Sequence, residues 1–195
     1  TLAISAPKKC GKTLLNAVLL CWRWLCLEGE HFAVANDLDQ AVGRQFSEIT
    51  DMVRRHPFLR SKVQSDKKRI EFKPTYSTIT ALPVDAAGNS GANHLSASHT
   101  ECWAIINEGA IRAFEELTPP PHKHHGYPSL RIVDSYAGFD GDSELWHGIV
   151  DRGLAGELLS EHYPIYKNNR TLVFHIEGEE GQERCFRGAV EERID

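Results

Sequence analysis

Hydrophobic and polar positions along this chain follow two patterns: short apolar runs, which are typical of buried strands, and longer runs with helical spacing. His94–His99 consists mostly of small residues and predicts a weak strand. Arg69–Leu82 alternates like a strand pair joined by a Pro-Thr-Tyr-Ser turn. The clearest apolar runs predict strands at Leu2–Ser5, His31–Ala35, Leu130–Asp134 and Thr171–Ile176.

Helices are predicted between these strands. Thr13–Leu27 is apolar on nearly every face, which indicates a helix buried on most sides. Asp37, with Gln40 three residues later, can cap a second helix that runs to about Arg55 and stops before Pro57. Two further helices are predicted at 105–117 and 144–159, and loops at 86–93, 119–128 and 135–142.

This alternation of strands and helices predicts the fold class. Such chains form an α/β fold in which a central, mostly parallel sheet is flanked by helices. A length of 195 residues fits one domain with a substantial core, and we expect a single domain over residues 1–195.

Composition and charge narrow the functional classes. The net charge of −5 argues against a uniformly basic protein that coats nucleic acid, but it leaves room for a local basic patch. No apolar run is long enough to span a bilayer, and no secretory leader is visible. The five cysteines have neither CxxC nor zinc-ligand spacing, which favours a reducing intracellular compartment.

One loop between a strand and a helix has the residues of a phosphate-binding loop. Gly11 lets backbone N–H groups at a helix start approach an anion, which the helix dipole also favours. Lys12 would reach the β and γ phosphates, and the Thr13 hydroxyl would ligate Mg²⁺. Ala6 stands where such loops usually have glycine. The candidate nucleotide-binding segment is Ala6, Pro7, Lys8, Lys9, Cys10, Gly11, Lys12 and Thr13.

Two later strand ends add candidate groups. Glu101 follows a strand at its C-terminal end, where open α/β sheets bind ligands, and could deprotonate an attacking water. Many P-loop enzymes have Asp-Glu at this point, but here Thr100 precedes Glu101 and could hold only a magnesium-bound water. Ser135, at the tip of strand 130–134, could sense the γ-phosphate. A plain exposed carboxylate and a plain turn are the alternatives.

In their order and spacing, these motifs resemble the ATPase domain of the large terminase subunit of tailed bacteriophages. The resemblance runs from residue 1 to about 150, with a looser match at 170–175. It rests on the Walker A-like loop at 6–13, Asn-Asp-Leu-Asp-Gln-Ala at 36–41, the helix end at 52–59, the loop at 87–91, Thr-Glu-Cys-Trp at 100–103, and Ser-Tyr-Ala-Gly at 135–138.

The resemblance implies a P-loop NTPase of the ASCE type, with the strand before Ser135 lying between the Walker A strand and the Glu101 strand. It implies ATP and Mg²⁺ as ligands and hydrolysis that drives double-stranded DNA into a procapsid. It also implies Glu101, Lys12 and Lys9 (or Lys8) as catalytic residues, with Thr13 and Thr100 at the metal. The implied partners are a portal protein and a small terminase subunit. We expect a homo-oligomeric ring during packaging, a monomer when isolated, and a location in the host cell cytoplasm.

Departures from the family keep alternatives open. Thr100 replaces the expected Asp, and the family's RNase H-like nuclease domain and its adenine-contacting segment have no counterpart in the sequence. Another P-loop translocase or helicase, or a decayed, non-hydrolysing assembly module, would share the phosphate loop.

Two clusters of side chains have weaker functional interpretations. The basic residues 54, 55 and 67–69 are interpreted as a solvated surface in preference to a DNA contact. His122, His124 and His125 lack the spacing of a metal site.

Overall fold

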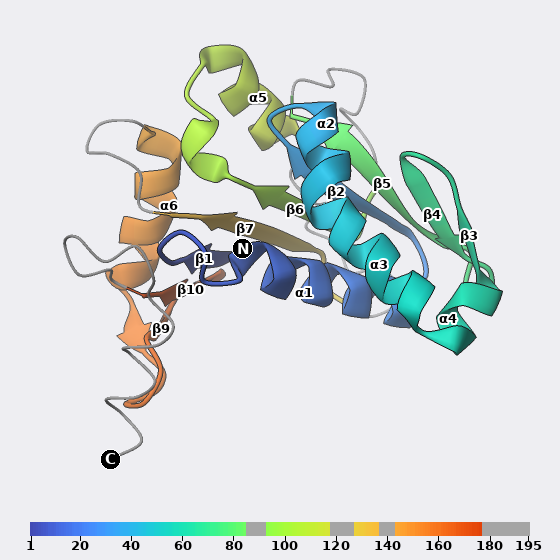
Figure 1. Cartoon of the computed structure of the whole chain (residues 1–195). Coiled ribbons are helices and arrows are strands. Elements are labelled where there is room, and N and C mark those ends of the chain that lie inside the picture. Colours follow the sequence, from blue (N-terminus) through green and yellow to red (C-terminus); the bar gives the residue numbers. More distant parts are fainter. Residues whose placement is uncertain (85–92, 118–126, 137–142, 177–195) are drawn as a thin grey trace.

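The computed structural model describes residues 1–84, 93–117, 127–136 and 143–176, which form a single sheet between two layers of helices (Figure 1). The sheet order is β3-β4-β5-β2-β6-β7-β1-β10-β9-β8. The central strands are parallel: β5 (Ser77–Pro83), β2 (Glu30–Ala35), β6 (Ser96–Thr100), β7 (Leu130–Ser135), β1 (Leu2–Ser5) and β10 (Thr171–His175). The flanking strands are antiparallel: β3 (Val63–Ser65), β4 (Arg69–Phe72), β9 (Ile165–Asn168) and β8 (Glu157–Leu158).

Alternate residues of the strands face two separate cores. Ala33 and Ala35 of β2 face α1 (Lys12–Cys26) and α3 (Ser47–Arg55), whose buried residues include Leu20, Trp24 and Ile49. Phe32 and Val34 of β2 face the opposite side, against α5 (Glu108–Glu116) and α6 (Glu144–Leu154). This period of two is what a parallel sheet covered on both faces requires.

The predicted α/β architecture is confirmed. The order β6-β7-β1 places the strand that ends at Ser135 between the Walker A strand and the Glu101 strand, as the resemblance implied. Within the described ranges, none of the helices has the length and apolar character of a membrane-spanning segment.

The predicted helix from Asp37 to about Arg55 is confirmed as one continuous helical segment, although its hydrogen-bonding pattern changes along its length. The segment begins as α2 (Leu38–Ala41), where the Asp37 carboxylate accepts a hydrogen bond from the Gln40 amide at 2.7 Å. It then widens into a π-helix, η1 (Val42–Phe46), before α3 starts. A further helix, α4 (Pro57–Lys62), follows the break at His56, because proline is well placed in a first helical turn.

Other predicted boundaries also shift. The predicted helix 105–117 starts at Glu108, capped by the Asn107 side chain, after a 3-10 turn at Cys102–Ala104 (η2). The predicted helix 144–159 ends at Leu154. A Cβ at Gly156 would lie 2.2 Å from the Lys167 carbonyl oxygen, so the chain passes tightly against β9 there. The predicted loops at 86–93, 119–128 and 135–142, with the three histidines, lie largely outside the described residues.

α6 packs closely against β10 because residue 153 is glycine, which has no Cβ. A Cβ built there would lie 1.9 Å from Cγ2 of Val173, whereas one at Gly148 of the same helix would meet nothing within 4 Å. We therefore expect Gly153→Ala to lower the free energy of unfolding by about 1–3 kcal/mol through overpacking. Gly148→Ala should raise it by up to about 1 kcal/mol through helix propensity. Urea unfolding of both variants measures this, and a shift in the same direction for both would contradict the packing argument.

Candidate functional site

The predicted phosphate loop joins β1 to α1 and has an open, anion-facing geometry. Gly11 is the residue before α1 and has φ 80°, a left-handed conformation that glycine adopts without strain. Because Gly11 has no side chain, the N–H groups of the first turn of α1 are left for an anion to cap. Lys9 also has positive φ, at 68°, which bends the loop around the same point.

Lys12 lies in the middle of this loop. Its Nζ donates a hydrogen bond to the carbonyl oxygen of Pro7 at 2.7 Å, and the Cys10 thiol donates to the same oxygen at 2.7 Å. Burial lowers the pKa of Lys12, and the nearby Cys10, Asp134 and Glu101 groups partly offset that effect. The ammonium thus lies inside the loop, bonded to the loop's own backbone.

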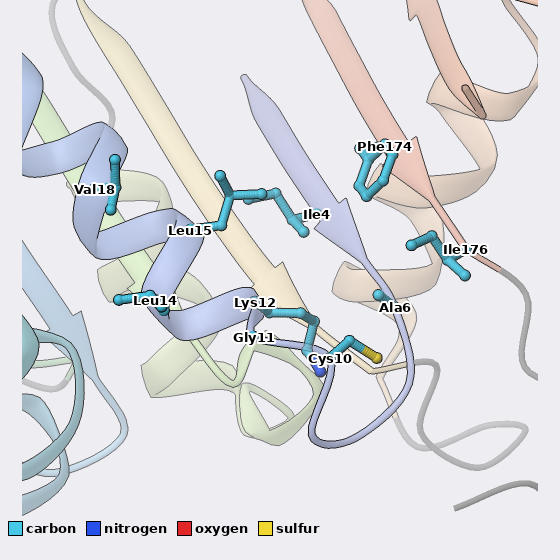
Figure 2. A pocket seen from close by; sticks show the side chains of 10 residues that line it. All are labelled: Ile4, Ala6, Cys10, Gly11, Lys12, Leu14, Leu15, Val18, Phe174 and Ile176. Carbon is cyan, nitrogen blue, oxygen red and sulfur yellow. The ribbon is translucent and has the colours of Figure 1, made fainter. Parts of the chain in front are cut away.

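An apolar pocket of about 370 Å³ opens beside the loop (Figure 2). Cys10, Gly11 and Lys12 form its rim on the loop side. Figure 2 shows side chains of β1, α1 and β10 around it, namely Ile4, Leu14, Leu15, Val18, Phe174 and, just after β10, Ile176. Leu14, Leu15 and Val18 are nearly half exposed and Trp22 is 60% exposed, so α1 presents an apolar face to the surface. The prediction that this helix is buried on most sides is therefore wrong.

Glu101 lies at the C-terminal end of β6, as predicted. It adopts φ 59° and ψ 46°, a left-handed conformation that is uncommon for a residue with a side chain. Its carboxylate accepts hydrogen bonds from Arg44 Nη1 at 2.9 Å and from Trp103 Nε1 at 2.7 Å. Arg44 belongs to the π-helix η1, so this irregular turn is what brings a cation to Glu101.

Ser135 lies between the phosphate loop and the Glu101 segment. Its carbonyl oxygen accepts from the Ala6 amide at 3.2 Å, and its Oγ accepts from the Trp103 amide at 3.1 Å. Next to it, the Tyr136 ring lies 4.5 Å below Lys8 Nζ and 5.3 Å from the Trp103 ring. Lys8 and Lys9 are both exposed, and Lys8 is the one that contacts an aromatic ring.

A buried polar network ties α1 to the sheet beneath the loop. Asn16 donates from Nδ2 to Asp134 Oδ1 at 3.2 Å, and its Oδ1 accepts from the Ser98 hydroxyl at 2.5 Å. Gln45 in turn donates to the Ser98 oxygen at 2.5 Å. All four side chains are at most 2% exposed, so every one of these bonds replaces water.

Asp134 is the site residue that the sequence reasoning missed. Burial raises its pKa to about 6, an effect that the Thr100 hydroxyl, the Asn16 amide and Lys12 oppose and Glu101 reinforces. Thr100 is close enough to influence Asp134, although its buried hydroxyl does not reach full hydrogen-bond geometry with any described residue. The signal was present in the sequence, since an acidic residue near the end of an otherwise apolar strand is rare.

A strand, phosphate loop and helix at one end of a parallel sheet, with Glu101 and Ser135 on the neighbouring strand ends, define the P-loop NTPase fold. The structure is similar to the large terminase of bacteriophage HK97, with a TM-score of 0.60 and 18% identity over 79% of this chain. It is also similar to a mutant of the large terminase ATPase domain of Thermus phage P74-26, with a TM-score of 0.57 and 14% identity, over 90% of this chain and 75% of that one.

These likenesses show that the chain has the fold of large terminase ATPase domains. The chain spans about a third of the length of the HK97 protein, of which 33% is covered. No family model and no curated protein matches the sequence.

The buried Asp134 carboxyl makes stability depend on pH. Its pKa is raised from 3.8 to about 6 in the folded state, so folding favours the protonated form, and stability is lost as pH rises from about 4 through 6. Asp134→Asn keeps an acceptor for Asn16 without the charge. We expect this variant to be more stable than the parent by roughly 2–3 kcal/mol at pH 8 and nearly equal at pH 4. Chemical denaturation at both pH values tests this, and a variant that is less stable at pH 8 would refute it.

Proposed function

We propose that this chain is the ATP-hydrolysing motor domain of a phage DNA-packaging terminase. One observation carries the proposal: the phosphate loop with Lys12, the Glu101 carboxylate and the tip of β7 meet at one edge of the sheet. They do so in the fold of large terminase ATPase domains. That edge is where open α/β sheets bind nucleotides.

The phosphate loop and the apolar pocket bind different parts of the nucleotide. The triphosphate lies on the amides at 11–13, with Lys12 on its β and γ oxygens. The adenine enters the apolar pocket against Leu14, Leu15 and Phe174, whose side chains suit a flat ring. The pocket thus supplies a base site that the sequence alone did not suggest.

Magnesium fits the donors present. Among the described residues, no three His, Cys, Asp or Glu side chains gather into a metal site. Mg²⁺ needs no such cluster, because phosphate oxygens, water and one or two protein oxygens complete its shell. The Thr13 hydroxyl, at the start of α1, is one such oxygen. When bound, the ion neutralises charge on the β and γ phosphates.

Glu101 is the general base in this proposal. Its carboxylate takes a proton from a water whose oxygen attacks the γ-phosphorus, while the bond from that phosphorus to the bridging oxygen breaks, leaving ADP and phosphate. Arg44 and Trp103 hold the carboxylate in place. Lys9, exposed in the loop, is the cation available to assist at the γ-phosphate, because Lys8 packs on Tyr136.

Ser135 couples the two loops. It bonds to Ala6 at the start of the phosphate loop and to Trp103 in the Glu101 segment, so a change at either loop reaches the other through one residue. We propose that loss of the γ-phosphate is transmitted by this route.

A basic patch supports duplex DNA as the translocated substrate. Residues 54–73 contain eight Lys or Arg and only two acids, although the whole chain has a net charge of −5. All eight cations are exposed: Arg54, Arg55, Arg60, Lys62, Lys67, Lys68, Arg69 and Lys73. They lie on the end of α3, on α4 and on the β3–β4 hairpin, at one edge of the molecule (Figure 1). Such a concentration of positive charge is what a phosphate backbone attracts.

The remaining elements of the proposal concern the assembled motor. We propose that residues 1–195 act as one P-loop domain, that copies form a ring on a portal protein in the host cytoplasm, and that a small terminase subunit delivers the DNA. The similarity of the fold to terminase ATPase domains supports this assignment.

The catalytic assignment predicts two separable defects. Lys12→Ala should weaken ATP binding about tenfold to a hundredfold by removing a charge-assisted bond. Glu101→Gln should keep ATP binding and lower hydrolysis by roughly 10²–10⁴-fold. Calorimetry and phosphate release measure these, with the exposed Lys167→Ala and Glu161→Gln as matched controls. Hydrolysis that survives in Glu101→Gln rules out its role as base, and ATP binding without any hydrolysis in the parent favours an assembly module.

The basic patch predicts salt-dependent DNA binding. Joint replacement of Lys67, Lys68 and Arg69 by alanine should weaken duplex binding and reduce the slope of log affinity against log salt by up to about three. The control replaces Arg152, Lys167 and Arg170, which are exposed on another part of the surface. Fluorescence anisotropy at several salt concentrations measures both. Equal losses of duplex affinity in the two triple variants would contradict the proposal that the basic patch contacts DNA.

A further inference from the structure

The candidate site lacks a carboxylate at the place where the P-loop fold usually has one. Thr100 closes β6 immediately before Glu101, and it is 2% exposed. Its hydroxyl reaches full hydrogen-bond geometry with none of the described residues, although it lies close enough to Asp134 to lower the pKa of that carboxyl. A threonine at this position leaves the metal side of the site without a negative charge from β6.

A carboxylate lies one strand away at the same level. β6 and β7 are parallel, and Thr100 is the Cα partner of Asp134 across them. Asp134 is in turn the Cα partner of Ile4 in β1, the strand that leads into the phosphate loop. Partner residues of adjacent strands point to the same face of a sheet, so Thr100 and Asp134 share a face.

That face is the one covered by the phosphate-loop helix. Asn16 of α1 bonds both to Ser98, two residues before Thr100 on β6, and to Asp134 on β7. Thr13 precedes Asn16 by three residues, which places it on the same side of α1 and one turn nearer the phosphates. Asp134 therefore lies under α1, on the side of the helix that also carries Thr13.

The environment of Asp134 leaves its charge without a matched cation. The carboxylate is 1% exposed, and its direct hydrogen bond comes from the neutral Asn16 amide. Asp134 takes no part in the ion pairs found among the described residues. A buried carboxylate is costly unless a cation compensates it. Lys12 is near enough to lower the pKa of Asp134, but its Nζ donates a hydrogen bond to the Pro7 carbonyl oxygen and not to that carboxylate.

We propose that Asp134 replaces the missing β6 aspartate and supplies the carboxylate that holds Mg²⁺ together with Thr13. The acidic group has moved from the end of β6 to the adjacent strand, and Thr100 fills the vacated position. This inference rests on the proposed nucleotide-binding function and names the metal-binding residue within it.

The test measures how much Mg²⁺ strengthens ADP binding, which needs no turnover. Calorimetry compares ADP affinity in Mg²⁺ with ADP affinity in EDTA for the parent, Asp134→Asn, and Asp134→Asn combined with Thr100→Asp. Asp151→Asn, the same chemical change at an exposed position on α6, is the matched control. Thermal melts of each variant establish that it is folded at the temperature of the titration.

We expect Asp134→Asn to lose roughly tenfold or more of the Mg²⁺-dependent gain in ADP affinity while keeping its affinity in EDTA. Adding Thr100→Asp should restore part of the gain, because it returns a carboxylate to the same face. An Asp134→Asn variant with the full gain of the parent overturns the inference and leaves the proposed function standing. A parent that binds ADP in neither buffer overturns the proposed function, and the inference with it.

Discussion

Close to the phosphate loop, one side-chain amide ties α1 to two strands of the sheet. Asn16 uses its N–H group on Asp134 and its oxygen on Ser98, so a single residue fastens α1 to β7 and β6 at once. The surroundings are dry, and loss of either bond would leave a buried polar group unsatisfied. Gln45 extends the same network to the π-helix, which carries Arg44 to Glu101. The network of Asn16, Ser98, Asp134 and Gln45 is buried, and the more exposed bond from Arg44 connects it to the candidate base.

Features that weaken the fold gather at this edge of the sheet. Lys9 and Glu101 have left-handed backbones without being glycine, as do Tyr76 and Asn169 in turns elsewhere, and Asp134 is a buried carboxylate under a helix. Each of these costs free energy that a protein selected for stability alone would recover. The apolar cores on the two faces of the sheet compensate, with Trp24 and Trp146 among the most deeply buried side chains. Strain and buried charge that coincide with a loop shaped for phosphate are typical of a site kept for function.

The central strands and the phosphate loop were accessible to sequence reasoning because their signals are local. An apolar run followed by Gly-Lys-Thr and an apolar helix marks β1, the loop and α1 without reference to the rest of the chain. The antiparallel strands β3, β8 and β9 are short and have no fully buried residue, so they carry no apolar run. The π-helix was hidden because its extra residue breaks the period of 3.6 on which helix prediction relies. The sequence shows an aspartate at position 134, but it does not show that this residue is the partner of Thr100 on the adjacent strand. Only the register of the sheet reveals that pairing.

Trp103 connects the candidate base to the phosphate loop in a second way. Its indole N–H bonds to Glu101, its ring packs on Tyr136, and Lys8 of the loop lies over the other ring. An indole held between a carboxylate and an aromatic neighbour has an emission that responds to small shifts of either. The chain has four tryptophans, and Trp24 and Trp146 are enclosed in the two cores, away from such shifts. Trp22 is exposed on α1 and emits as well, so in a chain from which Trp22 is removed the change in emission reports where the Glu101 side chain lies, with no label attached.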